Sequence, residues 1–312
     1  MAEPRPLNFL WRRTTLDNIL EGYFIANILL GAIGRPVRVI PFEDGQPVPL
    51  GPDTLIGSLA LETVPLLKEA RQRGIRNIGF FHMDDEEGKH DLSFYADADY
   101  VIRNYWHRHA FARHGNSLGV TWVPNGYRTG LGPIDPARHL GIAQRSVMGF
   151  FSGAMSGRLM AGQRAAMLQA VRQAALPFTI ITTGGFGQGL GPTAYAAWLS
   201  NTRFALVPAG NSHETIRLYD ALEAGAIPIM VRSAFIEEPQ ALGALGKPPF
   251  ILLDSWDGLA AAYAPYADAN APATIAKLEQ QRQAVVTWWA AFKRHVQQAV
   301  KDVIDRSFAR SE

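Results

Sequence analysis

The sequence predicts an α/β protein made of two Rossmann-like domains, each built on a parallel β-sheet, with one long helix at the C-terminus. Short apolar runs alternate along the chain with segments of helical periodicity, which is typical of strand-helix-strand units. The chain has 312 residues, which is more than one small core needs and suits two domains of about 150 residues each.

Apolar runs bounded by turn residues mark the expected strands in both halves of the chain. In the first half they lie at 37–41, 54–59, 77–82, 99–102 and 120–123. In the second half they lie at 147–151, 178–182, 204–207, 226–231 and 250–253. Helical periodicity predicts helices at 61–73, 161–174 and 215–224.

A turn-rich segment around Pro133, Asp135 and Pro136 separates the two series of strands. We therefore expect an N-terminal domain over residues 1–140 and a C-terminal domain over residues 141–312. Ligands of parallel sheets bind outside the carboxyl ends of the strands. The active site is accordingly expected in a cleft between the two domains, which would face one another.

The C-terminal region predicts a single long helix with one apolar face. Apolar residues recur there at spacings of mostly three or four, which is the helical period. A helix of this length could cross back to the first domain. The residues of the face are Ile275, Leu278, Val285, Trp289, Phe292, Val296, Val300 and Val303.

The composition limits the classes of function. Hydrophobic residues make up 47% of the chain and charged residues 19%, as in ordinary globular proteins. The formal net charge of +2 argues against a nucleic-acid surface, which needs a strong basic excess. The absence of cysteine excludes disulfides, thiolate metal sites and a cysteine nucleophile.

The N-terminal residues lack the apolar core of a secretion signal. The most apolar early stretch, 16–33, is interrupted by Asp17, Asn18 and Glu21, whereas a membrane span needs about 20 apolar residues. A buried or amphipathic helix is expected there instead. We expect a soluble, cytoplasmic protein without a transmembrane segment, and peripheral membrane contact is left open.

The segment from Tyr195 to Val231 carries the clearest functional pattern. It contains a helix, a buried strand FALVP, a loop AGNSHE, a helix TIRLYDALEAG and a second strand AIPIMV. A loop between a strand end and a helix start suits a phosphate, because free N–H groups and the helix dipole point at it. A cation in the first turn, here Arg217, is unfavourable for the dipole unless an anion lies nearby. Gly210 would let a ligand approach the backbone, Asn211 or Ser212 is expected to cap the helix, and the predicted donor loop also includes His213 and Thr215.

This segment resembles the C-terminal half of exostosin-type glycosyltransferases (glycosyltransferase family 47). The family pattern is a tyrosine, F-x-L-x-P-x-G, a loop and an S/T-x-R-x-x-D/E-A-L-x-x-G/A-x-x-P-V/I run. The matching residues here are Tyr195, Phe204, Leu206, Pro208, Gly210, Thr215, Arg217, Asp220, Ala221, Leu222 and Pro228. Upstream, FFSGAMSGRLMAGQRAAML resembles the strand, glycine loop and arginine-bearing helix of the family, with Arg158 and Arg164 as candidates. In the first half, GFFHMDDE, ADYVIRNYW and WVPNGY are similar to the ribitol xylosyltransferase branch associated with the same fold.

The resemblance implies the two-domain GT-B fold and a hexosyl- or pentosyltransferase of polysaccharide biosynthesis. The donor would be a nucleotide diphosphate sugar, with UDP favoured, and the acceptor a glycan or a polyol phosphate. Two other functions stay open on the same fold: an epimerase or hydrolase of nucleotide sugars, and a catalytically inactive glycan-binding protein. No cofactor is expected to be strictly required, since arginines can carry the phosphate charge, but Mn²⁺ or Mg²⁺ remains an alternative.

The resemblance also implies roles for single residues. Asp220 aligns with the carboxylate that accepts hydrogen bonds from the ribose hydroxyls of the nucleotide. Arg217, Arg164 and Arg158 are candidates to neutralise the leaving diphosphate, because guanidinium groups suit phosphate oxygens. Retaining GT-B enzymes carry a glutamate eight residues before that carboxylate. Here that position is Ser212, which favours an inverting mechanism.

An acidic cluster follows the apolar run NIGFFH in the first half of the chain. Inverting transfer needs a base for the acceptor hydroxyl proton, and a carboxylate or histidine at the carboxyl end of a strand would serve. Asp85 is the favoured base, followed by Asp84, Glu86 and His82. Together with Glu87, the cluster could instead ligate a divalent cation through oxygens or form a solvated acidic turn.

Two further loops are expected to contact the acceptor. One follows the apolar run ADYVI, where an aromatic ring can stack on a sugar, and contains Arg103, Asn104, Tyr105 and Trp106. The other is the turn in WVPNGYRTG, with Asn125, Tyr127 and Arg128. Packing alone is the alternative for the aromatic residues in these loops.

Overall fold

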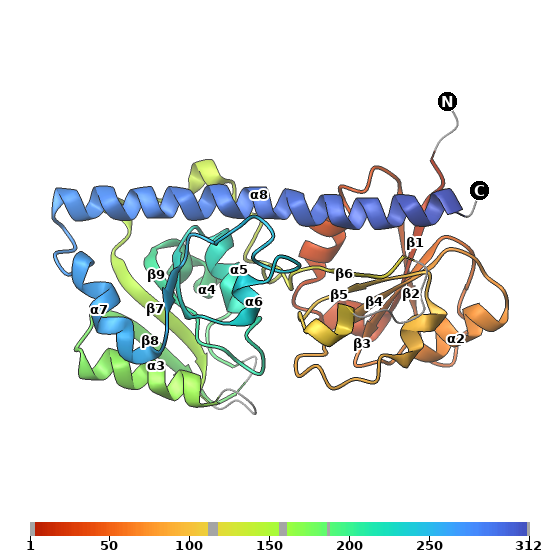
Figure 1. The fold of residues 1–312 in the computed structure, drawn as a ribbon, viewed down its shortest axis with the longest axis horizontal. Coiled ribbons are helices and arrows are strands. Elements are labelled where there is room, and N and C mark those ends of the chain that lie inside the picture. Colours follow the sequence, from red (N-terminus) through yellow and green to blue (C-terminus); the bar gives the residue numbers. More distant parts are fainter. Residues whose placement is uncertain (1–3, 112–117, 156–160, 186–187, 311–312) are drawn as a thin grey trace. The chain divides into compact units, whose positions relative to one another are not determined.

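The computed structural model describes residues 4–111, 118–155, 161–185 and 188–310 of the chain (Figure 1). Two compact units result: unit 1 comprises residues 1–124 and 293–312, and unit 2 comprises residues 125–292. Each unit is built around one parallel sheet. The predicted α/β class with two parallel sheets and a long C-terminal helix is confirmed.

Unit 1 contains a six-stranded parallel sheet with the order β2-β1-β3-β4-β5-β6. Its strands are β1 (Leu7–Arg12), β2 (Val37–Phe42), β3 (Thr54–Leu59), β4 (Ile78–Met83), β5 (Tyr100–Arg103) and β6 (Val120–Trp122). Five of them agree with the predicted strands, and β1 is additional. The run LNFLWR is too short and irregular to show a strand period by itself. It becomes a strand because it pairs with β2 on one side and β3 on the other.

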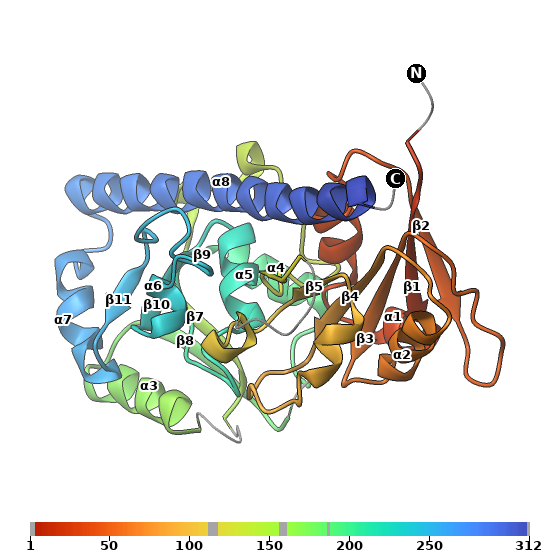
Figure 2. The ribbon, with the colours of Figure 1, turned by 45° about the vertical axis from the view of Figure 1, so that its right-hand side comes forward.

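Helices and short turns cover the unit 1 sheet. The early apolar stretch forms α1 (Arg13–Asn18) and a π-helical segment (Phe24–Leu29) in place of one helix. α2 (Val64–Gln72) contacts β3 and β4. Figure 2 shows this helix next to the strands of the unit 1 sheet. Two 3₁₀ turns lie at Ser93–Asp97 and Arg108–Phe111. The buried core of this unit includes Leu10, Ile56, Leu67, Phe80 and Val101.

Unit 2 contains a five-stranded parallel sheet with the order β11-β10-β9-β7-β8. Its strands are β7 (Val147–Ala154), β8 (Phe178–Thr183), β9 (Thr202–Leu206), β10 (Ile227–Val231) and β11 (Ile251–Leu253), all at predicted places. Its helices are α3 (Ala161–Gln173), α4 (Pro192–Ser200), α5 (Ile216–Glu223), α6 (Ala234–Glu237) and α7 (Leu259–Tyr263). Short 3₁₀ turns lie at Pro136–Arg138, Ile142–Gln144, Trp256–Gly258 and Ala264–Tyr266. The core includes Phe151, Phe204, Ile229, Leu259 and Leu278.

The predicted C-terminal helix is α8 (Pro272–Arg310), a single continuous element. Residues 272–292 of α8 belong to unit 2, and residues 293–310 belong to unit 1. Its apolar face is buried as the periodicity predicts, with Leu278, Val285, Phe292 and Val300 all 0% exposed.

The segment 125–139 belongs to unit 2, so the units divide at Pro124, whereas the sequence analysis placed the boundary at residue 140. The physical reason is a set of hydrogen bonds to α5. The N–H of Ile134 donates to Oε1 of Glu223 at 2.8 Å, and Nε2 of His139 lies 2.9 Å from the Glu223 carbonyl oxygen. Trp289 of α8 donates to the second carboxylate oxygen of Glu223 at 2.7 Å.

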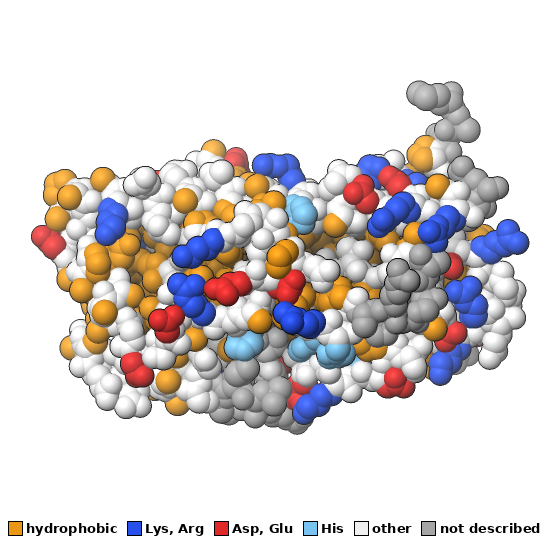
Figure 3. Space-filling model, in the orientation of Figure 1, with side chains coloured by type: hydrophobic (Ala, Val, Ile, Leu, Met, Phe, Trp, Pro, Cys, Tyr) orange, Lys and Arg blue, Asp and Glu red, His pale blue; other side chains and the backbone are white. Residues whose placement is uncertain are grey.

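Basic and acidic side chains are interspersed on the face drawn in Figure 3. Within the described ranges, no helix combines the length and the apolar character that crossing a membrane requires. The cytoplasmic location stays a prediction.

Glu223→Gln should destabilise unit 2. The carboxylate accepts from two N–H donors, whereas a glutamine amide has one accepting oxygen and would turn its NH₂ group toward a donor. We expect the free energy of unfolding to fall by about 1–3 kcal/mol, measured by urea unfolding. Glu237→Gln is the control, because Glu237 is 61% exposed and its loss should change stability by less than about 0.5 kcal/mol. Equal shifts in the two variants would contradict the anchoring role.

Candidate functional site

Parallel α/β sheets bind ligands where the strand order reverses, outside the carboxyl ends of the strands. In unit 2 this point lies between β7 and β9, which are neighbours in the sheet. β7 ends with Ser152, Gly153 and Ala154, and β9 leads into the loop 207–215 before α5. The predicted donor residues gather at this edge of unit 2.

Two arginines reach this edge from different helices. Arg217 of α5 donates from Nε to the carbonyl oxygen of Ser152 at 2.9 Å, and its guanidinium carbon lies 5.3 Å from the centre of the Phe151 ring. Arg164 of α3, which is 8% exposed, donates from Nη1 to the carbonyl oxygen of Ala154 at 2.5 Å. Burial lowers the pKa of the Arg217 guanidinium. No carboxylate of the described residues lies within ion-pair distance of Arg217, so an anionic ligand would stabilise its charge.

Two glycines make room for these guanidinium groups. A Cβ atom at Gly153 would overlap Nη2 of Arg217, and a Cβ at Gly210 would lie 2.9 Å from Nη2 of Arg164. The missing side chain of Gly210, predicted to admit a ligand, thus also accommodates an arginine. The third predicted arginine, Arg158, lies outside the described residues.

The loop after β9 has a local structure that differs from the predicted cap. The residue that caps α5 is Thr215, not Asn211 or Ser212, and its side chain makes no cap hydrogen bond. The Ser212 hydroxyl instead accepts from the N–H of Glu214 at 3.0 Å. Asn211, Ser212 and His213 are half-buried, and burial lowers the pKa of His213.

Asp220 has a different partner from the predicted ribose. It is 0% exposed, and its two carboxylate oxygens accept from Arg128: Oδ1 from the backbone N–H at 2.9 Å and Oδ2 from Nε at 2.8 Å. Burial raises the pKa of Asp220, and the charge and hydrogen bonds of Arg128 counteract part of that rise. In this structure Asp220 anchors Arg128 and presents no free oxygen pair to a diol.

Glu214 is a buried residue of this region that the sequence analysis missed. It is 3% exposed, and its Oε1 accepts from the N–H of Asn125 and from the hydroxyl of Tyr219, both at 3.0 Å. The sequence gives one indication of this role, which is that Glu214 is the one acidic residue of the loop 207–215. Together with Asp220 and Glu223, it attaches the segment 125–134 to α5 and to the loop before it.

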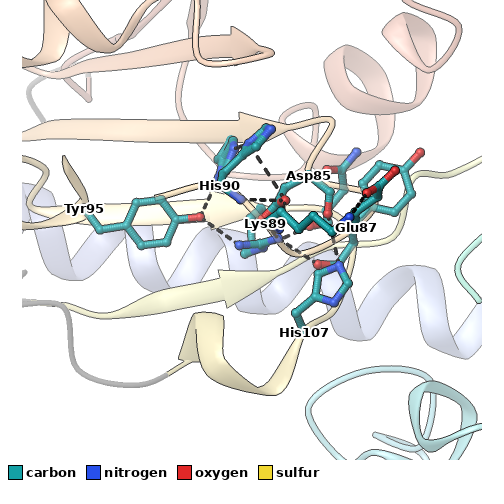
Figure 4. Close-up of polar contacts among 10 residues, drawn as sticks. Asp85, Glu87, Lys89, His90, Tyr95 and His107 are labelled. Carbon is teal, nitrogen blue, oxygen red and sulfur yellow. Dashed lines mark hydrogen bonds and ion pairs between the residues drawn. The ribbon is translucent and has the colours of Figure 1, made fainter. Parts of the chain in front are cut away.

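The second set of predicted residues lies in unit 1, at the carboxyl ends of β4 and β5. Figure 4 shows that its centre is Asp85, surrounded by hydrogen bonds. Oδ1 of Asp85 accepts from the N–H groups of Lys89 at 2.9 Å and His90 at 3.2 Å. Oδ2 accepts from Nη2 of Arg103 at 3.1 Å, and the two side chains are 2% and 0% exposed.

This environment argues against Asp85 as the predicted general base. Burial by itself would raise its pKa, but the charge of Arg103 and the hydrogen bonds from His90 and Arg103 lower the pKa of Asp85 below its ordinary value. A lowered pKa weakens a carboxylate as a base, and burial keeps an acceptor hydroxyl away. Asp85 and Arg103 form a structural ion pair, so Arg103 is also unavailable for the predicted acceptor contact.

His82 is also buried, at 1% exposure. Its Nδ1 lies 2.7 Å from the Tyr95 hydroxyl, and its Nε2 lies 3.0 Å from Nδ1 of His90. Burial, followed by the charge of Arg103, lowers the pKa of His82 to about 3. A neutral, enclosed imidazole of this kind organises the end of β4 and is not placed to accept a proton from an acceptor.

Asp84 and Glu86 keep the character that a base needs. Asp84 is exposed, whereas its neighbour Asp85 is buried, and the backbone of Asp84 has a left-handed φ of 74°. Desolvation by the surrounding protein, and then the charge of Glu86, raise the pKa of Asp84. Glu86 is half-buried and accepts from the Tyr105 hydroxyl at 3.0 Å.

The predicted acceptor residues separate into two groups. Tyr105 and Trp106 are half-buried beside the unit 1 cluster, whereas Asn104 is buried and donates its N–H to the His82 carbonyl at 3.3 Å. Asn125, Tyr127 and Arg128 belong to unit 2. Asn125 and Tyr127 are 2% and 0% exposed, so their side chains lie in the interior of unit 2 and not in a loop of the predicted N-terminal domain. Among the described residues, no group of three His, Asp or Glu side chains is arranged to hold a metal ion.

Comparisons with known proteins agree with this architecture. A family model described as "RXYLT1 C-terminal domain" matches residues 191–309, a range that includes the segment 195–231. No curated protein matches the chain.

Solved structures that are similar in fold include three that match almost the whole of this chain. A sucrose-phosphate synthase from Thermosynechococcus elongatus has a TM-score of 0.53 and 13% identity, over 97% of this chain and 100% of that chain. HepE from Anabaena, in complex with UDP and glucose, has a TM-score of 0.56 and 12% identity, over 97% and 100%. An O-GlcNAc transferase from Thermobaculum terrenum has a TM-score of 0.55 and 13% identity, over 99% and 69%.

The chain covers 58% of a further matched chain, from a GtfA/B complex. The three structures with TM-scores above 0.5 are 12–13% identical to this chain, and such likenesses establish the fold. This chain has the GT-B fold of two parallel-sheet α/β units with a long C-terminal helix.

The buried His82 should make stability depend on pH. Below pH 6.5 the unfolded imidazole binds a proton that folded His82, with its pKa of about 3, does not bind. The unfolded state then carries more protons, so the free energy of unfolding should fall with falling pH, by up to about 1.4 kcal/mol per pH unit. His82→Phe should flatten this slope between about pH 6 and pH 4, measured by urea unfolding. Measurements at pH 8 control for contacts that the variant loses, and parallel curves for the two proteins would contradict the prediction.

Proposed function

We propose that the protein is a glycosyltransferase that moves a sugar from a nucleoside diphosphate to an acceptor hydroxyl, with unit 2 as the donor-binding unit. The observation that carries the proposal is the meeting of Arg164 and Arg217 at the reversal point of the unit 2 sheet. Gly153 and Gly210 leave room for their guanidinium groups there. Guanidinium groups at the carboxyl edge of a parallel sheet suit a ligand that carries phosphate.

The comparisons support a nucleotide-sugar donor of the UDP type. HepE, which is similar in fold, is in complex with UDP and glucose. A sucrose-phosphate synthase and an O-GlcNAc transferase are also similar in fold. The family model covers the part of unit 2 that begins just before α4 and includes α5, on which Arg217 and Asp220 lie.

In the proposed reaction, the acceptor oxygen forms a bond to the anomeric carbon while the bond from that carbon to the β-phosphate oxygen breaks. The bonding electrons pass to the diphosphate, whose negative charge grows as it leaves. Arg217 and Arg164 would stabilise this charge, and in most enzymes the stabilisation of developing charge contributes more to the rate than any other effect. The proton of the acceptor hydroxyl passes to a base.

Asp84 is the proposed base, with Glu86 as the next candidate. Asp84 is exposed, and its raised pKa brings the carboxylate closer to the working pH, where a general base is most effective. A left-handed φ is uncommon for residues other than glycine, and such conformations concentrate at functional sites.

The proposal also covers the stereochemistry of the transfer and the class of acceptor. The position eight residues before Asp220 holds Ser212 and not a glutamate, which supports an inverting mechanism. The half-buried rings of Tyr105 and Trp106 could stack on a sugar, which supports a glycan or polyol-phosphate acceptor. The relationship to glycosyltransferase family 47 belongs to the same proposal and is supported by the sequence pattern around Arg217.

Gly153→Ala should weaken donor binding, because its methyl group would displace the Arg217 guanidinium. We expect UDP to raise the melting temperature of the wild type by preferential binding to the folded state, and GDP, ADP and dTDP to do so less. The shift with UDP should shrink in Gly153→Ala and persist in Gly162→Ala, where a Cβ meets nothing within 4 Å. If none of the four nucleotides changes the melting temperature of the wild type, the proposed donor site is wrong.

Asp84→Asn should lower kcat by about 100- to 10,000-fold, the usual contribution of a general base. The affinity for UDP should not change, since the donor residues lie on unit 2. Asp91→Asn is the matched control, because Asp91 is an exposed carboxylate on the same loop that accepts from Ser93. Products formed without an acceptor would separate transfer from hydrolysis or epimerisation. A kcat reduced less than tenfold in Asp84→Asn, with transfer intact, would exclude Asp84 as the base.

A further inference from the structure

We propose that Arg128 binds the diphosphate of the donor, and that Asp220 is the positioning residue that holds Arg128 for this purpose. The inference rests on the proposed function and deepens it by adding a third cation to the donor site. It also replaces the predicted contact of Asp220 with ribose by a role that acts through Arg128. All the side chains that carry the argument belong to unit 2.

Asp220 and Tyr195 hold the Arg128 guanidinium in place. The backbone N–H and Nε of Arg128 donate to the two oxygens of Asp220 at 2.9 and 2.8 Å. The guanidinium carbon lies 4.4 Å from the centre of the Tyr195 ring, within the range of a cation–π interaction. Asp220 is 0% exposed and Tyr195 is 4% exposed. Two buried partners therefore set the orientation of the guanidinium.

The outer nitrogens of this guanidinium keep their capacity for hydrogen bonds. Within the part of the chain that the structure describes, neither Nη1 nor Nη2 of Arg128 has a hydrogen-bond or ion-pair partner. The structural arginines differ, because Arg103 and Arg145 each donate through Nε, Nη1 and Nη2. The Arg128 side chain is also 21% exposed, against 0% for Arg103. An oriented guanidinium with two free nitrogens is the group that binds phosphate oxygens in pairs.

Arg128 lies close to Arg217 through its contact with Asp220 on the same helix as Arg217. Asp220 follows Arg217 by about one helical turn on α5, and Tyr195 lies in the first turn of α4 beside β7. The charge of Arg128 also contributes to the lowered pKa of Arg217, after burial and against the influence of Tyr195, in agreement with this geometry. The three arginines of the donor site outnumber the two buried carboxylates of this region, Asp220 and Glu214. A diphosphate can neutralise the remaining positive charge.

A direct contact with ribose would require a different arrangement at Asp220. Its oxygens already accept from Arg128, and its side chain is enclosed. Binding a diol would break these charge-assisted hydrogen bonds and leave the Arg128 guanidinium without its partner. The two roles therefore predict opposite responses to ligands with and without phosphate.

The test is isothermal titration calorimetry of the full chain with uridine, inorganic pyrophosphate and UDP. The proteins are the wild type, Arg128→Gln, Asp220→Asn and the double variant. Arg232→Gln is the matched control, because it removes an arginine of unit 2 that pairs with Asp254 on the surface.

Arg128→Gln should weaken the binding of pyrophosphate and UDP by about 10- to 100-fold, because a charge-assisted contact is lost. Its affinity for uridine should not change. Asp220→Asn should weaken pyrophosphate as well, because the guanidinium is no longer held. The double variant should bind no more weakly than Arg128→Gln, since both changes remove one contact. Arg232→Gln should bind all three ligands as the wild type does.

Unchanged pyrophosphate affinity in Arg128→Gln would overturn the inference while leaving the proposed function intact. If Asp220→Asn no longer binds uridine but still binds pyrophosphate, the inference is overturned and the ribose contact is favoured. If Asp220→Asn does not fold, Arg128→Lys decides, because lysine keeps the charge but lacks the fork and the Nε donor. Full pyrophosphate affinity in Arg128→Lys would then overturn the inference. A wild type that binds neither UDP nor pyrophosphate would overturn the proposed function and this inference together.

Discussion

Three buried carboxylates, two on α5 and one in the loop before it, must find hydrogen-bond donors inside unit 2, and the segment 125–134 supplies them. Each of Glu214, Asp220 and Glu223 accepts from a backbone N–H of that segment. Leaving a buried charge without partners costs several kcal/mol, so the segment folds onto α5 and belongs to unit 2. The same constraint brings Arg128 to the edge of the sheet where Arg217 lies, and the composition of the candidate donor site depends on it.

The same rule separates structural from chemical residues in unit 1. Asp85 and Arg103 are paired in the interior, and His82 is enclosed in a neutral form beside them. These groups hold the ends of β4 and β5, so their charges and hydrogen bonds are already used. Asp84 stays exposed, and desolvation followed by the charge of Glu86 raises its pKa. In both units, the side chains available for chemistry are those whose charge or hydrogen-bonding groups are not already paired inside the protein.

Much of the fold could be predicted because parallel strands buried on both faces are nearly continuous apolar runs. Ten of the eleven strands named here occur at predicted places. β3, β4, β5 and β9 are fully or almost fully buried, whereas β2 and β8 are only partly buried. β1 was missed because its status depends on pairing with β2 and β3, which are remote in sequence. The unit boundary at Pro124 was missed for a related reason. Hydrogen bonds from 125–134 to α5 assign that segment to unit 2, and a turn-rich composition cannot show where such bonds go.

The alternation of strands and helices, the buried face of α8 and the phosphate-type loop before Arg217 could all be read from the order of residues. These features follow from local periodicity and from neighbouring residues, which need no knowledge of distant partners. Only the folded structure shows which charged side chains are buried and paired with other residues. In the sequence, Asp85 follows a strand, Asp220 lies on a helix and Arg128 lies in a turn, and nothing there shows which of them is buried. Their protonation, exposure and partners depend on contacts between segments far apart in the chain, and those contacts exist only after folding.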